Sequence, residues 1–265
     1  SYMVGRPLDM LFPKEETHQG EEMLRVEDLC SPGLLYHVNF TAYAGQILGF
    51  SGLVGAGRTE TMRAIFGIDQ NKTGDIYVKG KKVSISKPRD AIRSNIAFLT
   101  EDRKREGLIL DASVKNNLHL ATIDKDVKGL FLDDKKLAVR SKENLESYRI
   151  KTPSIEAPVG TLSGGNQQKV VIAKWVNTNA DIYIFDEPTR GIDVGAKIEV
   201  YHVMNDLVRS GKCVIMISSE LPEILGMSDR VIVMRHGRIM AEIDRNSAHF
   251  NQEDIMRASW GGRLS

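Results

Sequence analysis

The sequence has few cysteines and no long apolar run, and its positive and negative charges nearly balance. Its two cysteines, Cys30 and Cys213, are far apart and do not make a disulfide framework, so a reducing compartment is the simpler interpretation. Apolar stretches such as "CVIMI" are far shorter than the ~18 residues of a membrane-spanning helix. The net charge of +1 gives no general electrostatic reason to bind nucleic acid or an anionic membrane.

What is present is typical of an ordinary globular domain. Hydrophobic residues make up 42% of the chain and charged residues 27%. A chain of 265 residues is long enough to bury a core without a disulfide or metal. Residues 1–21 are mostly polar and without period, and no signal-peptide pattern opens them, so we expect a linker or tail there. We expect the folded domain over residues 22–265.

Strand-like and helix-like segments alternate along most of this domain. The segment at 47–52 is an apolar strand that runs directly into a glycine-rich loop, and a short helix follows it. The segment at about 101–165 is richer in Lys, Asp, Glu and Asn, and its pattern is helical, so we interpret it as a helical insertion. Strands separated by helices favour an α/β fold with a mainly parallel, doubly covered sheet.

The loop from Gly52 to Thr59, "GLVGAGRT", fits the phosphate-loop template G-x-x-x-x-G-K-[ST] except at the lysine, where Arg58 stands. Glycines permit left-handed dihedrals and let backbone N–H groups approach a polyphosphate. The helix that follows adds its positive N-terminal end. Thr59 is placed to offer its hydroxyl to Mg²⁺. With the lysine missing, a tight strand-to-helix turn without a ligand is the alternative interpretation.

Two adjacent carboxylates, Asp186 and Glu187, end the apolar run "IYIFDEP". Ligands of open α/β sheets gather at the carboxyl ends of strands. One acid there can hold Mg²⁺, and its neighbour can orient or deprotonate an attacking water. The alternative is a helix-capping aspartate at a strand exit.

A third element is "LSGGNQQKVVIAKW", in which Ser163 begins a helix whose first turn carries two glycines. The N–H groups of that turn have no partner within the helix and can bind an anion in front of them. An ordinary helix N-cap is the alternative. The sequence therefore indicates two anion-binding backbone segments that are distant along the chain.

These three elements, in this order and spacing, resemble the nucleotide-binding domain of ATP-binding cassette (ABC) transporters, over nearly all of residues 22–245. The resemblance implies a P-loop NTPase fold of the ABC ATPase type. Such a domain has a mainly parallel core sheet, an antiparallel β subdomain and a helical subdomain, here at about 101–165. It also implies ATP and Mg²⁺ as ligands.

The segments "GLVGAGRTE", "EDRKREGL", "DEPTRGIDVGAK" and "SSELPEILGMSDR" resemble more narrowly the second nucleotide-binding domain of tandem monosaccharide import ATPases of the ribose, galactose and xylose type. The opening "MVGR" resembles the end of the first domain in those proteins. We therefore expect residues 1–21 to be the linker from a preceding domain and residues 22–265 to be the second domain.

The resemblance assigns roles to individual residues, because in this family two domains dimerise head to tail and sandwich each ATP. Glu187 is the expected catalytic base, and the expected metal site comprises Thr59, Asp186 and Glu101. The expected nucleotide contacts of the chain's own site and of its partner's site are Gly52, Gly55, Ala56, Gly57, Arg58, Thr59, Glu60, Ser163, Gly164, Gly165, Gln167, Asp193 and Ser219.

Three positions depart from the family pattern. Arg58 replaces the lysine, Glu101 stands where a glutamine is usual, and Ser219 stands where the switch histidine is usual. Arginine is a broad planar fork rather than a compact charge. An adenine-stacking aromatic is not obvious; Tyr36 is a weak candidate and fits a strand residue better. We therefore expect this domain to bind ATP but to hydrolyse it slowly, while its Ser163 segment completes a faster site on the first domain.

The resemblance also implies partners and a location. They are the first nucleotide-binding domain, a membrane permease dimer that docks near "EDRKREGLI", and, indirectly, a periplasmic or extracellular sugar-binding protein, with no nucleic acid. The basic residues of that segment also fit a solvated surface. The domain would then lie at the cytoplasmic face of a bacterial-type membrane and power sugar import. A non-hydrolytic regulatory module, or a soluble ABC protein acting on DNA or ribosomes, is the alternative; the latter predicts coiled-coil inserts or basic tails that the sequence lacks.

Overall fold

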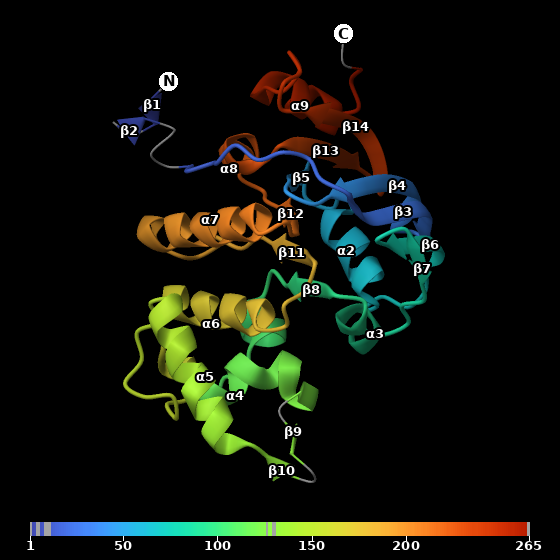
Figure 1. The fold of residues 1–265 in the computed structure, drawn as a ribbon. Coiled ribbons are helices and arrows are strands. Elements are labelled where there is room, and N and C mark those ends of the chain that lie inside the picture. The colour runs from blue at the N-terminus through green and yellow to red at the C-terminus, as the bar shows by residue number, and fades with distance from the viewer. Residues whose placement is uncertain (1, 4–5, 8–11, 126, 129–130, 264–265) are drawn as a thin grey trace.

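The structure is a computed structural model that describes residues 2–3, 6–7, 12–125, 127–128 and 131–263 (Figure 1). It contains a large core sheet flanked by helices, a smaller antiparallel sheet beside it, and a lobe of helices projecting from the core. This arrangement confirms the expected α/β fold with its two subdomains. None of the described helices is long and apolar enough to cross a membrane.

The core sheet has six strands, and its inner strands are parallel. Ile215 pairs with Leu48 on one side and with Ile184 on the other, so three apolar strands lie at the centre. Residues 213–217 are fully buried, as expected for a parallel strand covered on both faces. In spatial order the strands are β14 (Arg238–Asp244, antiparallel to its neighbour), β13 (Arg230–Arg235), β5 (Ile47–Gly52), β12 (Cys213–Ile217), β11 (Ile182–Asp186) and β8 (Ile96–Leu99).

Helices cover both faces of this sheet. α2 packs near β5 and β8, α6 against β8, α7 against β12, α8 against β5, and α9 against β5 and β13. Helix α7 carries an apolar stripe toward the core, since Val200, Met204 and Leu207 are all buried. The bounds of the helices are α2 (Arg58–Phe66), α3 (Pro88–Arg93), α6 (Gly164–Val176), α7 (Val194–Arg209), α8 (Leu221–Met227) and α9 (Gln252–Ser259).

The second sheet is antiparallel, in the order β4 (Leu35–Tyr43), β3 (Glu22–Ser31), β6 (Thr73–Val78) and β7 (Lys81–Val83). A tight hairpin turn joins β6 to β7, with Lys79 and Gly80 at φ 50° and 72°. Phe40 on β4 packs edge-on against Phe50 on β5 with ring centroids 5.2 Å apart, which joins the two sheets.

The insertion is mainly helical, as expected, and forms the lobe at the bottom of Figure 1. It contains α4 (Val114–His119) and α5 (Asp134–Ser147), a π-helical turn at Arg103–Gly107 and 3-10 turns at Leu120–Lys125 and Val159–Thr161. A small strand pair at its tip, β9 (Val127–Lys128) and β10 (Phe131–Leu132), was not predicted from the sequence.

The N-terminal segment is more ordered than a free tail. A short strand pair, β1 (Tyr2–Met3) and β2 (Arg6–Pro7), precedes it, and residues 12–20 contain no helix or strand. Phe12 nevertheless packs on Tyr201 with ring centroids 5.7 Å apart, and Lys14 pairs with Asp229 at 2.9 Å. A polar composition therefore did not prevent this segment from covering part of the core.

Candidate nucleotide-binding site

The glycine loop joins β5 to α2 in the geometry that a phosphate loop needs. Gly52, Gly55 and Gly57 all have positive φ, at 150°, 75° and 101°. In the part of the chain that the structure describes, no side chain caps the N-terminus of α2. The first-turn N–H groups therefore face outward without an intrahelical partner, available to an anion.

At two of these positions, Gly52 and Gly57, there is also no space for a side chain. A Cβ on Gly52 would lie 2.4 Å from the Met234 carbonyl oxygen, and one on Gly57 would lie 2.9 Å from Gly237 Cα. Ala56 is buried between them, and its carbonyl accepts the Gly237 amide at 2.9 Å. The loop is thus held against the turn between β13 and β14.

Arg58 points toward the ends of the neighbouring strands. Its Nη1 donates to the Ser218 carbonyl oxygen at 2.9 Å, and its Nη2 lies 4.0 Å from Glu187 Oε1. Both side chains of this charge pair are only 10% exposed. In this structure the Arg58 guanidinium therefore binds the Ser218 carbonyl and lies close to Glu187, the candidate base.

Asp186 and Thr59 form the candidate metal site. Asp186 is 1% exposed, and burial raises the pKa of its carboxyl to about 7, while the nearby Thr59 hydroxyl opposes that shift. Within the described part of the chain, no donor reaches either carboxylate oxygen with normal hydrogen-bond geometry. The buried Asp186 carboxylate, which lacks a normal hydrogen bond from any described residue, lies next to the Thr59 hydroxyl. Together they offer oxygen ligands of the kind that Mg²⁺ prefers.

Glu187 directly follows β11 and has a positive φ of 47°. Ser219 Oγ donates to Glu187 Oε2 at 3.1 Å. Burial raises the pKa of Glu187, while hydrogen bonds from Ser219 and the charge of Arg58 lower it. The structure thus brings Arg58, Glu187 and Ser219 together at one edge of the sheet, as expected for residues at strand ends.

The carboxylate of Glu101 has a partner other than the metal candidates Thr59 and Asp186. Glu101 forms an ion pair with Arg190 in the loop after β11. Among the described residues, no hydrogen bond joins Glu101 to Asp186, and the expected metal contact of Glu101 stays a prediction. Glu60 lies in the first turn of α2, half-buried.

The tip of α6 is exposed, as a site for a neighbouring molecule requires. Ser163 is exposed and caps the helix by accepting from the Asn166 amide. The Cβ position of Gly165 lies 3.6 Å from Asp193 Oδ2, so the loop that begins α7 adjoins this tip. Asp193 caps α7 through the Ala196 amide at 3.0 Å.

Arg103 holds the same region in place, a role that was not predicted from the sequence. Its Nη1 donates to the Arg190 carbonyl at 3.0 Å, and its Nη2 reaches the Gly191 carbonyl at 3.5 Å. A Cβ on Gly164 would lie 2.8 Å from Arg103 Nη2. Gly164 therefore leaves room for the arginine that joins the insertion to this loop.

The side chain of Gln167 does not face the exposed tip. It is 4% exposed, and its amide donates to the carbonyls of Val159 and Gly160 at 3.4 Å each. In this conformation Gln167 supports the loop that precedes α6, and its expected nucleotide contact stays a prediction. Its position three residues beyond the first helical glycine turns it inward, toward the loop that precedes the helix.

Glu223 is a second supporting residue that was not predicted from the sequence. It is fully buried and accepts hydrogen bonds from Thr189 at 2.7 Å, Tyr201 at 2.6 Å and Ser218. It thereby joins the loop after β11, helix α7 and the end of β12. From the segment "SSELPEIL" alone, Glu223 would be interpreted as a surface residue of a helix. Only its burial in the structure reveals this supporting role.

Residues 35–190 match the family described as ABC transporter. The chain belongs to the ABC transporter family. An import ATP-binding protein of Rhizobium etli, named for ribose, galactose and methyl galactoside, is 48% identical over 99% of this chain and 50% of its own length. The ribose import ATP-binding protein RbsA of Bacillus subtilis (strain 168) is 48% identical over 98% of this chain and 52% of its own length.

This ABC family member also shares the fold of solved ATP-binding cassettes. A nucleotide-free cassette of an ABC transporter superposes with a TM-score of 0.74 at 21% identity, covering 89% of this chain and 94% of that chain. A cassette in a dimeric post-hydrolysis state superposes with a TM-score of 0.71 at 20% identity, covering 85% and 100%. The expected family and fold are confirmed, and the chain spans about half the length of the curated relatives it matches.

Proposed function

We propose that this chain is the second nucleotide-binding domain of a tandem monosaccharide import ATPase. It binds ATP and Mg²⁺ and works with a first domain and a membrane permease dimer at the cytoplasmic face of the membrane. A sugar-binding protein delivers a ribose-like substrate to that permease. Support comes from the sugar-import names of relatives that are 48% identical and about twice as long as this chain.

The phosphate loop supplies the binding. Backbone amides of residues 52–59 would hold the triphosphate, since their glycine dihedrals and the open α2 N-terminus suit an anion. Thr59 and Asp186 would hold Mg²⁺, which when bound neutralises charge on the phosphates. Glu187 would hold and orient the attacking water through the oxygen that also accepts from Ser219.

The chain's own turnover is slow in this proposal, and the geometry of Arg58 carries the argument. Its guanidinium is engaged by the Ser218 carbonyl and lies beside Glu187, so its charge favours the ionised base more than a phosphate. Ser219 offers a short hydroxyl where the family has an imidazole. The absence of one positioned transition-state donor typically costs about 2.7–4 kcal/mol of barrier.

The Ser163 tip serves the other site. Its exposed N-terminal turn, backed by Arg103 and the Asp193 loop, would complete the triphosphate site of the first domain. These residues belong to segments other than the phosphate loop, so damage to the chain's own site leaves this contribution intact.

The test measures Mg²⁺-dependent phosphate release and nucleotide binding for the isolated chain and for the chain joined to its first domain. We expect binding with slow release from the isolated chain, and faster release from the joined protein. Ser163→Arg should abolish the fast release while leaving ATP binding by the isolated chain unchanged. Val139→Arg, at an exposed position of α5, is the control for an added surface charge. Equal turnover by the isolated and joined proteins would refute the division of labour.

A non-hydrolytic module is the second candidate, and the proximity of Arg58 to Glu187 favours it. It retains nucleotide binding and the Ser163 contribution but no turnover of its own. Comparing wild type with Glu187→Gln in the isolated chain separates the two functions. A loss of phosphate release in the variant supports slow hydrolysis, and identical background release in both supports the non-hydrolytic module.

A further inference from the structure

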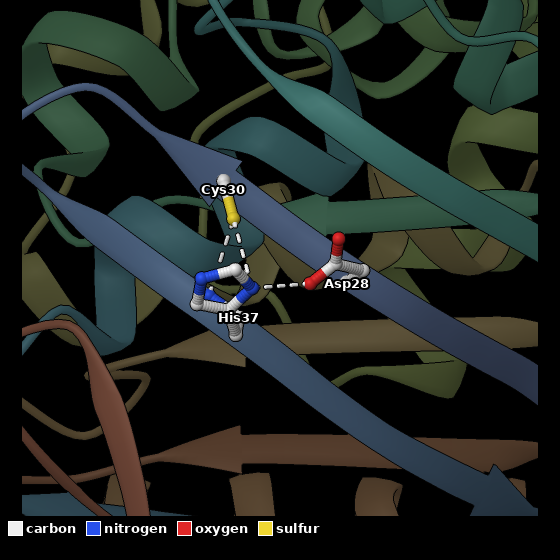
Figure 2. Close-up of side chains that lie close together, drawn as sticks. All are labelled: Asp28, Cys30 and His37. Atoms are coloured by element: carbon white, nitrogen blue, oxygen red, sulfur yellow. Dashed lines mark hydrogen bonds and ion pairs between the residues drawn. The ribbon is translucent and has the colours of Figure 1, made fainter.

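The antiparallel subdomain carries a second cluster of ligand-type side chains, separate from the phosphate loop. Asp28 and Cys30 lie on β3, and His37 lies on the paired strand β4 (Figure 2). Their donor atoms, a carboxylate oxygen, a sulfur and a ring nitrogen, all lie within 4.8 Å of one another. No step of the proposed ATP chemistry uses them.

The three side chains converge on a single nitrogen. His37 Nδ1 lies 2.5 Å from Asp28 Oδ1 and 3.8 Å from Cys30 Sγ. A thiol–imidazole–carboxylate relay needs the thiol and the carboxylate on opposite ring nitrogens. Here both face the same nitrogen, which suits one shared cation rather than proton transfer through the ring.

The backbone of this cluster is held in place before any ion binds. Asp28 and His37 have left-handed φ values of 51° and 53°, at irregularities in the strand register. Asn39 accepts the Asp28 amide and donates to the His37 carbonyl, each at 2.8 Å. The His37 amide donates to Cys30 Sγ at 3.2 Å, which orients the sulfur. Two ligand-bearing segments are thus joined by one asparagine.

We propose that Asp28, Cys30 and His37 form a binding site for a borderline divalent cation of the Zn²⁺ class. A thiolate, an imidazole and a carboxylate are the three ligand types that Zn²⁺ takes, and three protein ligands leave a position for water. The 3.8 Å sulfur–nitrogen separation suits two ligands of one such ion, and a small side-chain rotation opens the shorter oxygen–nitrogen separation. The Asp28 and His37 side chains are 68% and 67% exposed, so the ion has free access.

Co²⁺ serves as the spectroscopic probe, because its bond to a thiolate gives a charge-transfer absorption band that oxygen ligands do not give. The full chain is reduced, stripped with a chelator and titrated with Co²⁺. We expect the band to saturate at one equivalent and to disappear when Zn²⁺ is added. Co²⁺ bound at Asp186 and Thr59 has oxygen ligands only and stays silent in this band.

Each ligand is then removed by a change that its backbone tolerates. Cys30→Ser should abolish the band, and Asp28→Asn and His37→Asn should weaken Co²⁺ binding at least ~10-fold, since asparagine accepts the left-handed conformation. His249→Asn is the matched control: His249 also pairs with an aspartate, Asp254, at 3.0 Å, but with no thiol. Its band should equal that of the wild type.

Two results would overturn the site. One is the absence of a thiolate band in wild type whose circular dichroism shows the native fold. The other is a band that persists in Cys30→Ser, which would place the ion on buried Cys213 instead. ATP binding by the three variants is measured in parallel; unchanged ATP binding keeps this result independent of the proposed nucleotide function.

Discussion

At the scale of single residues, Arg58 stands where the phosphate-loop template has a lysine. Lysine would place a compact ammonium on a flexible stem, free to reach a phosphate. Arginine keeps the charge, but its longer fork reaches the Ser218 carbonyl and approaches Glu187. One substitution therefore redirects a positive charge from the ligand toward the strand ends.

Arg58→Lys should accelerate hydrolysis by the isolated chain. The shorter ammonium loses the Ser218 contact and becomes available to the phosphates, so we expect kcat to rise by up to ~10²-fold, the size of one positioned donor. Phosphate release at saturating ATP measures it. Arg209→Lys, a surface residue paired with Glu15, is the control and should leave kcat unchanged. A kcat at or below the wild-type value would contradict this account of Arg58.

Asp186 should make the nucleotide-free fold less stable as pH rises. Its pKa is raised from 3.8 to about 7 by burial, so between these values the folded state holds a proton that the unfolded state releases. Its contribution to stability therefore falls as pH rises from 3.8 to about 7 and is constant above. Above that pH the site carries a buried negative charge, which the proposed Mg²⁺ would neutralise.

The measurement is thermal unfolding of wild type and Asp186→Asn without Mg²⁺ or nucleotide. We expect the variant's advantage in Tm to grow from about pH 5 to about pH 8, because asparagine carries no charge. Asp206→Asn, a change at an exposed aspartate, should show no such trend. A Tm difference that does not vary with pH would show that Asp186 titrates elsewhere.

At the scale of elements, Glu223 on α8 links three segments that surround the site. Its carboxylate accepts hydrogen bonds from hydroxyl groups in the loop after β11, in α7 and at the end of β12. Ser218, one of these donors, also supplies the carbonyl that holds Arg58. The short helix thus sets the position of the strand ends that carry the chemistry.

Glu223→Ala should destabilise the protein by about 2–4 kcal/mol, because it leaves buried hydroxyl groups without an acceptor. Urea unfolding followed by circular dichroism measures the change. Glu220→Ala removes a carboxylate from the start of the same helix, where it pairs with Lys197 and is 53% exposed. That control should cost less than about 1 kcal/mol. Equal losses of unfolding free energy in both variants would contradict the linking role of Glu223.

At the scale of the whole molecule, residues 12–20 cover a face that a free tail would leave open. A Cβ on Gly226 would lie only 2.4 Å from Phe12 Cγ, so the ring rests directly on this glycine of α8. The Lys14–Asp229 and Arg209–Glu15 ion pairs hold the segment on either side. Residues 12–20, which the sequence predicts to be a linker, therefore pack on the folded domain.

Phe12→Ala should lower the free energy of unfolding by about 1–3 kcal/mol, less than for a fully buried phenylalanine because the ring is partly exposed. Gly226→Val should have a similar effect by displacing the ring. Val139→Ala, at an exposed site on α5, should change stability by less than about 0.5 kcal/mol. A Phe12→Ala protein as stable as wild type would restore the interpretation of a free tail.

The sequence by itself determined the parts of the site that depend on local geometry. The phosphate-loop glycines, the carboxylates at the end of β11 and the Ser163 helix start were all readable, because dihedral preference, strand exit and helix capping act within a few residues. The family pattern and the alternation of strands and helices led equally directly to the fold.

Only the tertiary structure decided which side chains meet. Arg58 and Ser218 are 160 residues apart in sequence, and Glu101 and Arg190 are 89 apart. The inward turn of Gln167, the burial of Glu223 and the meeting of Cys30 with His37 likewise depend on packing and strand register. Such contacts are set by the order and offset of elements distant along the chain, which no local preference specifies.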